Sequence, residues 1–262
     1  MYKLWDKTPL FDLNLAPEQK EPSIKPFLIE NSPNKSCIIV CPGGGYYIKA
    51  DHEGDPIAMA LNKAGVNAFV LDYRVIPYRQ PCPLLDLLRA IRYVRYHAEK
   101  FNIDPDKIGV LGFSAGGHLS SSASVHYDYP IDILDEIDKV SARPDFSVLC
   151  YAVINMAGDF GHPGSSEALC GKDASEELKN YYSSEKNVTK DTPPAFLWHT
   201  SEDDGVPVQN AYEYANALAK FKIPAEVHVF PKGRHGLGLA PEEPHVAQWM
   251  ELLEKWLRVS GF

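Results

Sequence analysis

The chain has 262 residues, of which 45% are hydrophobic and 23% are charged, a composition typical of a globular protein and not of a disordered or fibrous one. Its formal net charge of −9 argues against a nucleic-acid partner, because such binding needs clustered Lys and Arg that displace counterions from phosphates. A neutral or weakly charged small-molecule substrate fits this charge better.

The N-terminal residues and the cysteines indicate the compartment. Residues 1–7 lack the apolar core of a signal peptide, and no run approaches the roughly 18 apolar residues of a membrane span. A cytoplasmic location without a membrane partner is therefore expected. An odd number of cysteines without a C-x-x-C pair favours buried, reduced thiols over disulfides or metal ligands. These cysteines are Cys37, Cys41, Cys82, Cys150 and Cys170.

Short β-branched or aromatic runs alternate along the chain with longer segments of helical periodicity. This alternation predicts an α/β fold with a mostly parallel central sheet and helices on both faces. We interpret residues 1–262 as a single domain, because no Ser/Gly/Pro-rich linker or charge block divides them. The expected strands are residues 37–41, 66–72, 107–112, 147–154, 195–200 and 225–230, and the expected helices are residues 55–64, 83–100, 208–220 and 243–259.

The strand pattern is weak in residues 1–34, and residues 158–192 depart from the alternation. Residues 1–34 are interrupted by Pro and Asn, and they are expected to hold two or three further strands. Residues 158–192 combine Gly, Ser and charge clusters with two short helix-like pieces. We predict that they form a short insertion over the active-site edge of the sheet.

A glycine loop follows the first strong strand. Residues 42–47 read PGGGYY, and the missing Cβ of a glycine lets a substrate oxygen approach the backbone N–H closely. Gly44 and Gly45 are therefore candidate donors to an oxyanion. A phosphate-binding loop is disfavoured, because no Lys-Ser or Lys-Thr follows and the G-x-G-x-x-G spacing is absent. A plain tight turn is the other alternative.

Two tyrosines at the end of this loop, Tyr46 and Tyr47, are candidate substrate-binding residues. Their rings would suit stacking on a sugar or an aryl group, and packing within the protein is an equally good interpretation. His52 and Glu53 lie just beyond, and we interpret them as structural or loop-positioning residues.

A nucleophile elbow follows the strand predicted at residues 107–112. Residues 112–116 read GFSAG, a G-x-S-x-G element in which a tight strand-to-helix turn holds the serine in a strained conformation. Small residues two positions before and two positions after the serine prevent clashes. Ser114 is therefore the candidate nucleophile, and the N–H of Ala115 is the second candidate oxyanion donor.

A serine nucleophile needs a histidine as base and a carboxylate that orients the histidine, in the chain order Ser, acid, His. His235 follows the strand predicted at residues 225–230 and is the candidate base. The acid is expected after the strand at residues 195–200, where Asp203 and Asp204 lie, with Asp159 as a reserve. The histidines that we interpret as structural are His97, His118 and His228.

These motifs resemble the α/β-hydrolase superfamily, and within it the acetyl xylan esterase-like proteins and the bifunctional acetylxylan and feruloyl esterases, which are related to dienelactone hydrolases and prolyl oligopeptidases. Hydrolases of this fold usually place the acid four residues before the proline of a Val-Pro pair, which selects Asp203. Pro42 stands where HGGG lipases have a histidine, and this leaves the backbone donors intact. The resemblance covers nearly the whole chain, with PGGGY at residues 42–46, DYR at 72–74, GFSAGGH at 112–118, TPPAFLWHT at 192–200 and HGLGLA at 235–240.

The resemblance implies a serine carboxylesterase that removes acetyl groups from sugars or xylo-oligosaccharides through an acyl-enzyme. Ser114, Asp203 and His235 would be its catalytic residues, and no metal or organic cofactor would take part. Two rival functions stay open. A peptidase of the prolyl oligopeptidase type is disfavoured because no propeller-sized N-terminal domain is present, and the other rival is a hydrolase-fold binding protein without turnover. A homo-oligomer is compatible with the sequence.

Overall fold

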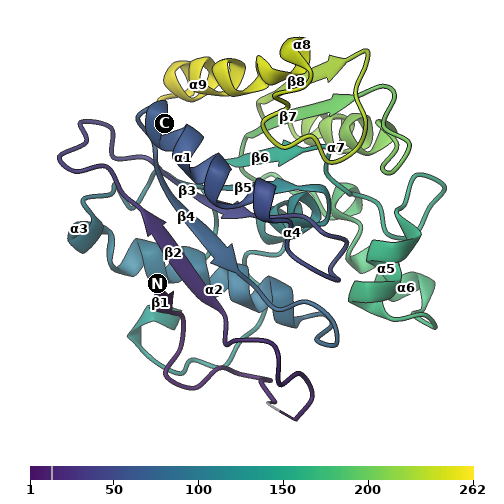
Figure 1. The fold of residues 1–262 in the computed structure, drawn as a ribbon. Helices are drawn as coiled ribbons and strands as arrows, with labels where there is room; N and C mark the ends of the chain where they lie inside the picture. The colour runs from purple at the N-terminus through teal and green to yellow at the C-terminus, as the bar shows by residue number, and fades with distance from the viewer. Residues whose placement is uncertain (13) are drawn as a thin grey trace.

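The computed structural model describes residues 1–12 and 14–262 (Figure 1). Among them, eight strands form one sheet in the order β1-β2-β4-β3-β5-β6-β7-β8. The two antiparallel pairs, β1 with β2 and β2 with β4, lie at one edge, and all other neighbours are parallel. The predicted α/β fold with a mostly parallel sheet is confirmed. The strands are β1 (Tyr2–Lys3), β2 (Ser23–Phe27), β3 (Cys37–Cys41), β4 (Asn67–Asp72), β5 (Ile108–Phe113), β6 (Ser147–Cys150), β7 (Ala195–Thr200) and β8 (Ala225–Phe230).

Helices cover both faces of the sheet (Figure 1). The side chains of β3 alternate between the two faces: Ile38 and Val40 belong to one hydrophobic cluster, and Ile39 and Cys41 belong to another. A strand that is buried on both faces has to be continuously hydrophobic, as β3 is. The first cluster includes residues of α1 (Asp55–Lys63) and α9 (Trp249–Ser260), and the second includes residues of α2 (Cys82–Tyr96) and α4 (Ser114–Val125). The remaining helices are α3 (Ala98–Phe101), α5 (Pro163–Cys170), α6 (Glu176–Tyr181), α7 (Gln209–Lys220), α8 (Pro244–Ala247) and the short 3-10 turns η1 (Asp51–Glu53), η2 (Glu136–Lys139) and η3 (Ser184–Lys186).

Three elements are shorter or more divided than the sequence predicts. The strand expected over residues 147–154 ends at Cys150, because Tyr151 has a φ of 35° that turns the chain out of the extended conformation. The long helix expected over residues 83–100 is divided into α2 and α3 at His97, and the last helix is divided into α8 and α9 at Gln248. Residues 1–34 hold β1 and β2, with residue 13 outside the described part, and residues 158–192 hold α5, α6 and η3.

The carboxyl ends of the parallel strands meet at one edge of the sheet, where open α/β sheets bind ligands. The glycine loop follows β3, the elbow follows β5, and the segments with Asp203 and His235 follow β7 and β8. The topology therefore brings four segments that are distant in the sequence to the same edge.

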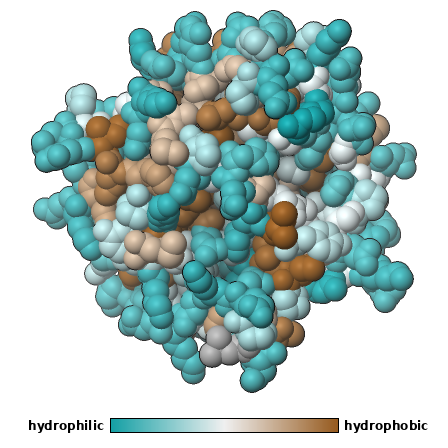
Figure 2. Space-filling view, viewed as in Figure 1, coloured by the Kyte–Doolittle hydropathy of each residue, from teal (hydrophilic) through white to brown (hydrophobic). Residues whose placement is uncertain are grey.

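The surface of the protein is mostly hydrophilic on the face shown in Figure 2, where hydrophobic residues form separate patches. All five cysteines are buried with unpaired thiols. Within the part of the chain that the structure describes, none of the helices combines the length and the apolar character that a membrane span requires.

Candidate active site

Ser114 lies at the tight turn between β5 and α4, with a φ of 51° in the left-handed region. Few residues other than glycine adopt this conformation without strain. The turn brings neighbouring backbone very close: a Cβ on Gly112 would lie 2.0 Å from the carbonyl oxygen of Gly116, and one on Gly116 would lie 2.1 Å from that of Cys41. Both glycines of the predicted elbow are therefore required by its geometry.

In the structure, hydrogen bonds connect the three predicted side chains in the order Asp203, His235, Ser114. His235 Nε2 lies 2.8 Å from Ser114 Oγ, and His235 Nδ1 lies 2.7 Å from Asp203 Oδ2. A carboxylate only accepts hydrogen bonds, so Nδ1 carries the proton and donates to Asp203. Nε2 is then free to accept the hydroxyl proton of Ser114, which is the geometry that a general base requires.

Asp203 is set apart from the other two candidate acids by its surroundings. Its Oδ1 accepts the N–H groups of Gly205 at 3.0 Å and Val206 at 2.8 Å. Burial by itself would raise the pKa of Asp203, but hydrogen bonds from His199, His235 and the backbone hold this pKa well below its usual range. Asp203 therefore stays ionised, whereas Asp204 and Asp159 are exposed.

His199 was not singled out by the sequence, although it ends the run TPPAFLWHT together with Thr200. It is fully buried, and its Nε2 lies 3.3 Å from Asp203 Oδ2 and 2.8 Å from the carbonyl oxygen of Val206. This second imidazole shares the carboxylate oxygen that faces His235. In the sequence, the feature that could have indicated this contact is the position of His199 four residues before Asp203.

The glycine loop presents free amides beside the elbow. The amides of Gly44, Gly45 and Ala115 have no hydrogen-bond acceptor among the described residues. The N–H of Gly43 is occupied, because it donates to Glu53 Oε2 at 2.8 Å. Gly43 is also close to Ser114, since a Cβ on it would lie 3.0 Å from Ser114 Cβ. The three predicted donors are thus unoccupied and lie on segments that adjoin Ser114.

The two tyrosines of the loop have different surroundings. Tyr46 is 1% exposed, and its hydroxyl lies 2.7 Å from Nδ1 of His118, whose burial lowers its pKa to about 4. Its ring belongs to the core, so the structure favours packing over substrate stacking for Tyr46. Tyr47 is 45% exposed and stays a candidate for substrate contact.

The insertion carries His162, a histidine that the sequence analysis did not select. His162 caps the N-terminus of α5, where its Nδ1 accepts the N–H of Ser165 at 3.1 Å. Burial and the neighbouring His235 lower the pKa of His162, which keeps its ring neutral.

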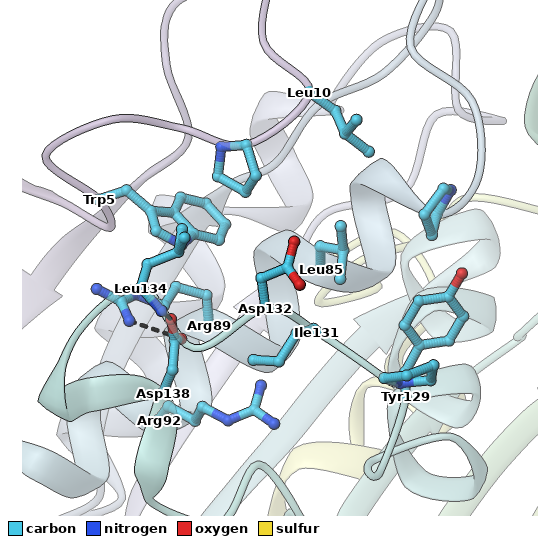
Figure 3. Close-up of a pocket in the computed structure, with 13 residues that line it drawn as sticks. Trp5, Leu10, Leu85, Arg89, Arg92, Tyr129, Ile131, Asp132, Leu134 and Asp138 are labelled. Carbon is cyan, nitrogen blue, oxygen red and sulfur yellow. Dashed lines mark hydrogen bonds and ion pairs between the residues drawn. The ribbon is translucent and has the colours of Figure 1, made fainter.

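A separate cavity of about 260 Å³ lies among the N-terminal segment, α2 and the segment that precedes η2 (Figure 3). Trp5, Leu85 and Ile131 line it, and Arg89 pairs with Asp138 at 2.7 Å in its wall. None of the residues that line it is a predicted site residue, so this cavity is not a candidate for the reacting ester. In the described part of the chain, no group of three or more His, Cys, Asp or Glu side chains is placed to hold a metal ion.

A mostly parallel sheet with helices on both faces, and with a serine on a strained turn after its central strand, defines an α/β hydrolase. A family model described as BD-FAE matches residues 27–218, which is most of the chain. The chain belongs to the BD-FAE family.

Two curated proteins are similar to this chain. It is 42% identical over 227 residues to endo-1,4-beta-xylanase B of Butyrivibrio fibrisolvens, a match that covers 85% of this chain and 35% of that protein. It is 34% identical over 253 residues to an acetylxylan esterase of Xylanibacter ruminicola, which covers 95% of this chain and 50% of that protein. The chain thus spans 35% and 50% of the length of these relatives.

A solved structure is similar over the whole chain. The acetyl ester-xyloside bifunctional hydrolase from Caldicellulosiruptor lactoaceticus has a TM-score of 0.95 and 49% identity, and the match covers 100% of this chain and 96% of that one. Together with the family match, these similarities confirm the resemblance to acetyl xylan esterase-like α/β hydrolases that the motifs predicted.

Proposed function

We propose that the protein is a serine carboxylesterase that removes acetyl and other short acyl groups from xylo-oligosaccharides or related sugars. The observation that carries this proposal is the line of hydrogen bonds from Asp203 through His235 to Ser114, beside free backbone amides. The names of the relatives support the substrate class, since they include an acetylxylan esterase and an acetyl ester-xyloside hydrolase.

In the proposed cycle, His235 accepts the proton of Ser114 while Oγ attacks the ester carbonyl. The amides of Ala115 and of Gly44 or Gly45 hold the oxyanion of the tetrahedral intermediate, where each such donor is worth about 3 kcal/mol. His235 then protonates the departing sugar hydroxyl, and an acyl-enzyme remains. A water activated by His235 releases the acid, and Asp203 holds the imidazole throughout.

The nucleophile is tested with Ser114→Ala and p-nitrophenyl acetate. We expect kcat to fall by at least about a thousandfold with an unchanged melting temperature, because the hydroxyl makes the new covalent bond. Ser120→Ala is the matched control: it removes a buried hydroxyl from the same helix, and that hydroxyl makes no hydrogen bond to Ser114, Asp203 or His235. Turnover retained in purified Ser114→Ala protein would refute the proposal.

The two rival functions predict other results. A peptidase of the prolyl oligopeptidase type would prefer aminoacyl amides to acetylated xylo-oligosaccharides in a competition assay. A binding protein would turn over no ester in a panel of acetyl, feruloyl and longer acyl substrates, and a fluorophosphonate adduct at Ser114 together with ester turnover would exclude this rival. We expect turnover of acetyl esters and little amide cleavage.

From the sequence we further propose that residues 1–262 form one domain and that the protein is cytoplasmic. We also propose that it needs no metal or organic cofactor and that Tyr47 contacts the substrate. Activity that survives dialysis against EDTA tests the cofactor statement, and cell fractionation tests the location.

A further inference from the structure

One peptide bond of the glycine loop is held at both ends by buried side chains. The carbonyl oxygen of Pro42 accepts the hydroxyl of Tyr73 at 2.6 Å, and the N–H of Gly43 donates to Glu53 Oε2 at 2.8 Å. Tyr73 is 1% exposed and Glu53 is 2% exposed. Rotation of this peptide plane would break both bonds inside the protein, where the freed groups find no water. The orientation of this peptide plane is therefore fixed, and the N–H groups of Gly44 and Gly45 follow it directly in the chain.

Glu53 also connects this loop to the segment that carries His235. Its Oε1 accepts the hydroxyl of Tyr151 at 2.6 Å, and the same phenol oxygen accepts the N–H of Gly238 at 2.8 Å. The ring of Tyr151 stands edge to face against the imidazole of His235, with centroids 5.0 Å apart. A continuous buried chain of hydrogen bonds thus runs from Gly43 through Glu53 and Tyr151 to Gly238.

Tyr151 itself has little freedom to move. It is 1% exposed, its backbone N–H donates to the carbonyl oxygen of Trp198 at 2.7 Å, and its φ of 35° comes directly after β6. Burial and the nearby Glu53 carboxylate raise the pKa of Tyr151 well above its usual value, so the phenol stays protonated and remains a donor. At the far end of the chain of bonds, the carbonyl oxygen of Gly238 accepts Trp249 Nε1 at 3.0 Å.

We propose that Glu53 and Tyr151 are positioning residues that hold the oxyanion loop and the His235 loop in register with each other. Neither residue needs to touch the substrate. The inference rests on the proposed function, because it assigns the two loops their roles in ester hydrolysis.

Ester hydrolysis requires that the two loops keep a fixed position relative to each other. The oxyanion donors and the general base lie on segments that follow different strands, and the transition state needs both within a few tenths of an ångström of their positions. A carboxylate suits the position of Glu53 because it offers two acceptor oxygens, one for Gly43 and one for Tyr151. An amide at this position offers one acceptor and one donor, so it satisfies only one of the two bonds in the same way.

The test compares Glu53→Gln, Tyr151→Phe and the double variant with p-nitrophenyl acetate as substrate. We expect each single variant to lower kcat by about 10- to 100-fold while KM changes by less than about threefold, because the alignment of the transition state is lost and ground-state binding is not. The rate of inactivation by a fluorophosphonate should fall in parallel, since its tetrahedral phosphonyl oxygen occupies the same position as the oxyanion. The kcat of the double variant should be about equal to that of the slower single variant, because the two residues act as one unit.

The matched control is Tyr214→Phe. Tyr214 is a fully buried tyrosine on α7, and its hydroxyl takes no part in the hydrogen bonds that run from Gly43 to Gly238. This variant should keep the kcat of the parent protein. Melting temperatures of all variants show whether they are folded. If Glu53→Gln does not fold, Tyr151→Phe tests the inference alone, because this substitution removes only one oxygen atom.

The inference is overturned where folded Tyr151→Phe or Glu53→Gln keeps the parent kcat, or where the losses of the two variants multiply in the double variant. Ser114→Ala separates this result from a failure of the proposed function. An inactive Ser114→Ala protein beside fully active Glu53 and Tyr151 variants removes only the inference, whereas an active Ser114→Ala protein removes both.

Discussion

Asp203 and Asp204 are adjacent and chemically identical, and their surroundings alone give them different properties. The carboxylate of Asp203 is buried and accepts two backbone N–H groups besides the imidazole of His235. Asp204 is exposed. An exposed carboxylate is screened by water and cannot fix the orientation of a histidine, so the orienting role belongs to Asp203 in our proposal.

Asp203→Asn tests this assignment. The backbone N–H groups of Gly205 and Val206 would hold the amide oxygen, so the NH2 group would face Nδ1 of His235. This favours the wrong tautomer of His235, so kcat should fall by about ten-thousandfold. Hydrolysis of p-nitrophenyl acetate measures the effect, and circular dichroism confirms folding. Asp204→Asn is the control and should lie within about twofold of the parent. A large loss in Asp204→Asn or Asp159→Asn, with an active Asp203→Asn, would move the acid to that other residue.

At the scale of elements, the turn from β5 into α4 depends on close packing against the end of β3. A Cβ on Gly116 would lie 2.1 Å from the carbonyl oxygen of Cys41 and 2.5 Å from that of Pro42. Cys41 is the last residue of β3 and pairs with Gly112 of β5, so neither strand can move aside on its own. The elbow is therefore a contact between three elements as well as a local turn.

Gly116→Ala should lower the free energy of unfolding by more than about 3 kcal/mol, because the added methyl group overlaps backbone that is held by sheet hydrogen bonds. Gly65→Ala is the comparison. Gly65 has a φ of 83° and nothing within 4 Å of an added Cβ, so it should cost only the left-handed strain of about 1–2 kcal/mol. Urea unfolding at neutral pH measures both. Equal losses in the two variants would contradict the packing argument.

At the scale of the whole molecule, the insertion is attached to α4, the helix that begins at Ser114. Nε2 of His118 lies 2.6 Å from the carbonyl oxygen of Tyr182, and the hydroxyls of Ser121 and Ser184 are 2.8 Å apart. All four residues are buried. These contacts join the C-terminal part of the insertion to α4 in the interior, which is the property of a fixed wall and not of a mobile lid.

Hydrogen exchange should show this attachment. The N–H of Ser184 donates to the carbonyl oxygen of Ile154 at 3.1 Å, so amides near residue 184 should exchange slowly in the free protein, and a fluorophosphonate adduct should leave them unchanged. The exposed residues 172 and 173 are the internal comparison and should exchange fast. Fast exchange at residue 184 that becomes slow in the adduct would indicate a lid that closes.

The tertiary structure also holds the N-terminal segment through pairs that no local pattern indicates. Arg74 and Asp86 form a fully buried ion pair at 2.7 Å, and Arg74 donates at 2.7 Å to the carbonyl oxygen of Pro9. Arg89 donates to the carbonyl oxygen of Leu4 at 2.7 Å. Both arginines thus join α2 or the loop before it to the first residues of the chain.

The sequence by itself determined the order of the elements, the mostly parallel sheet and the family. It also selected Ser114, Asp203 and His235 as a candidate triad and the glycine loop beside them. The elements and the elbow are readable because hydrophobic periodicity and turn chemistry act between residues close in the chain. The family and the choice of Asp203 came from the resemblance to known hydrolases. The catalytic roles of the three side chains stay a prediction until the variants are measured.

The tertiary structure alone decided the end of β6 at Cys150, the burial of Tyr46, and the contacts of His199, Glu53 and Tyr151. Each depends on a partner brought near by folding: Glu53 and Tyr151 are 98 positions apart, and Tyr46 and His118 are 72 apart. A single sequence records which side chains can donate or accept a proton. Which of them meet is set by the packing of strands and helices, and that packing is a property of the whole chain.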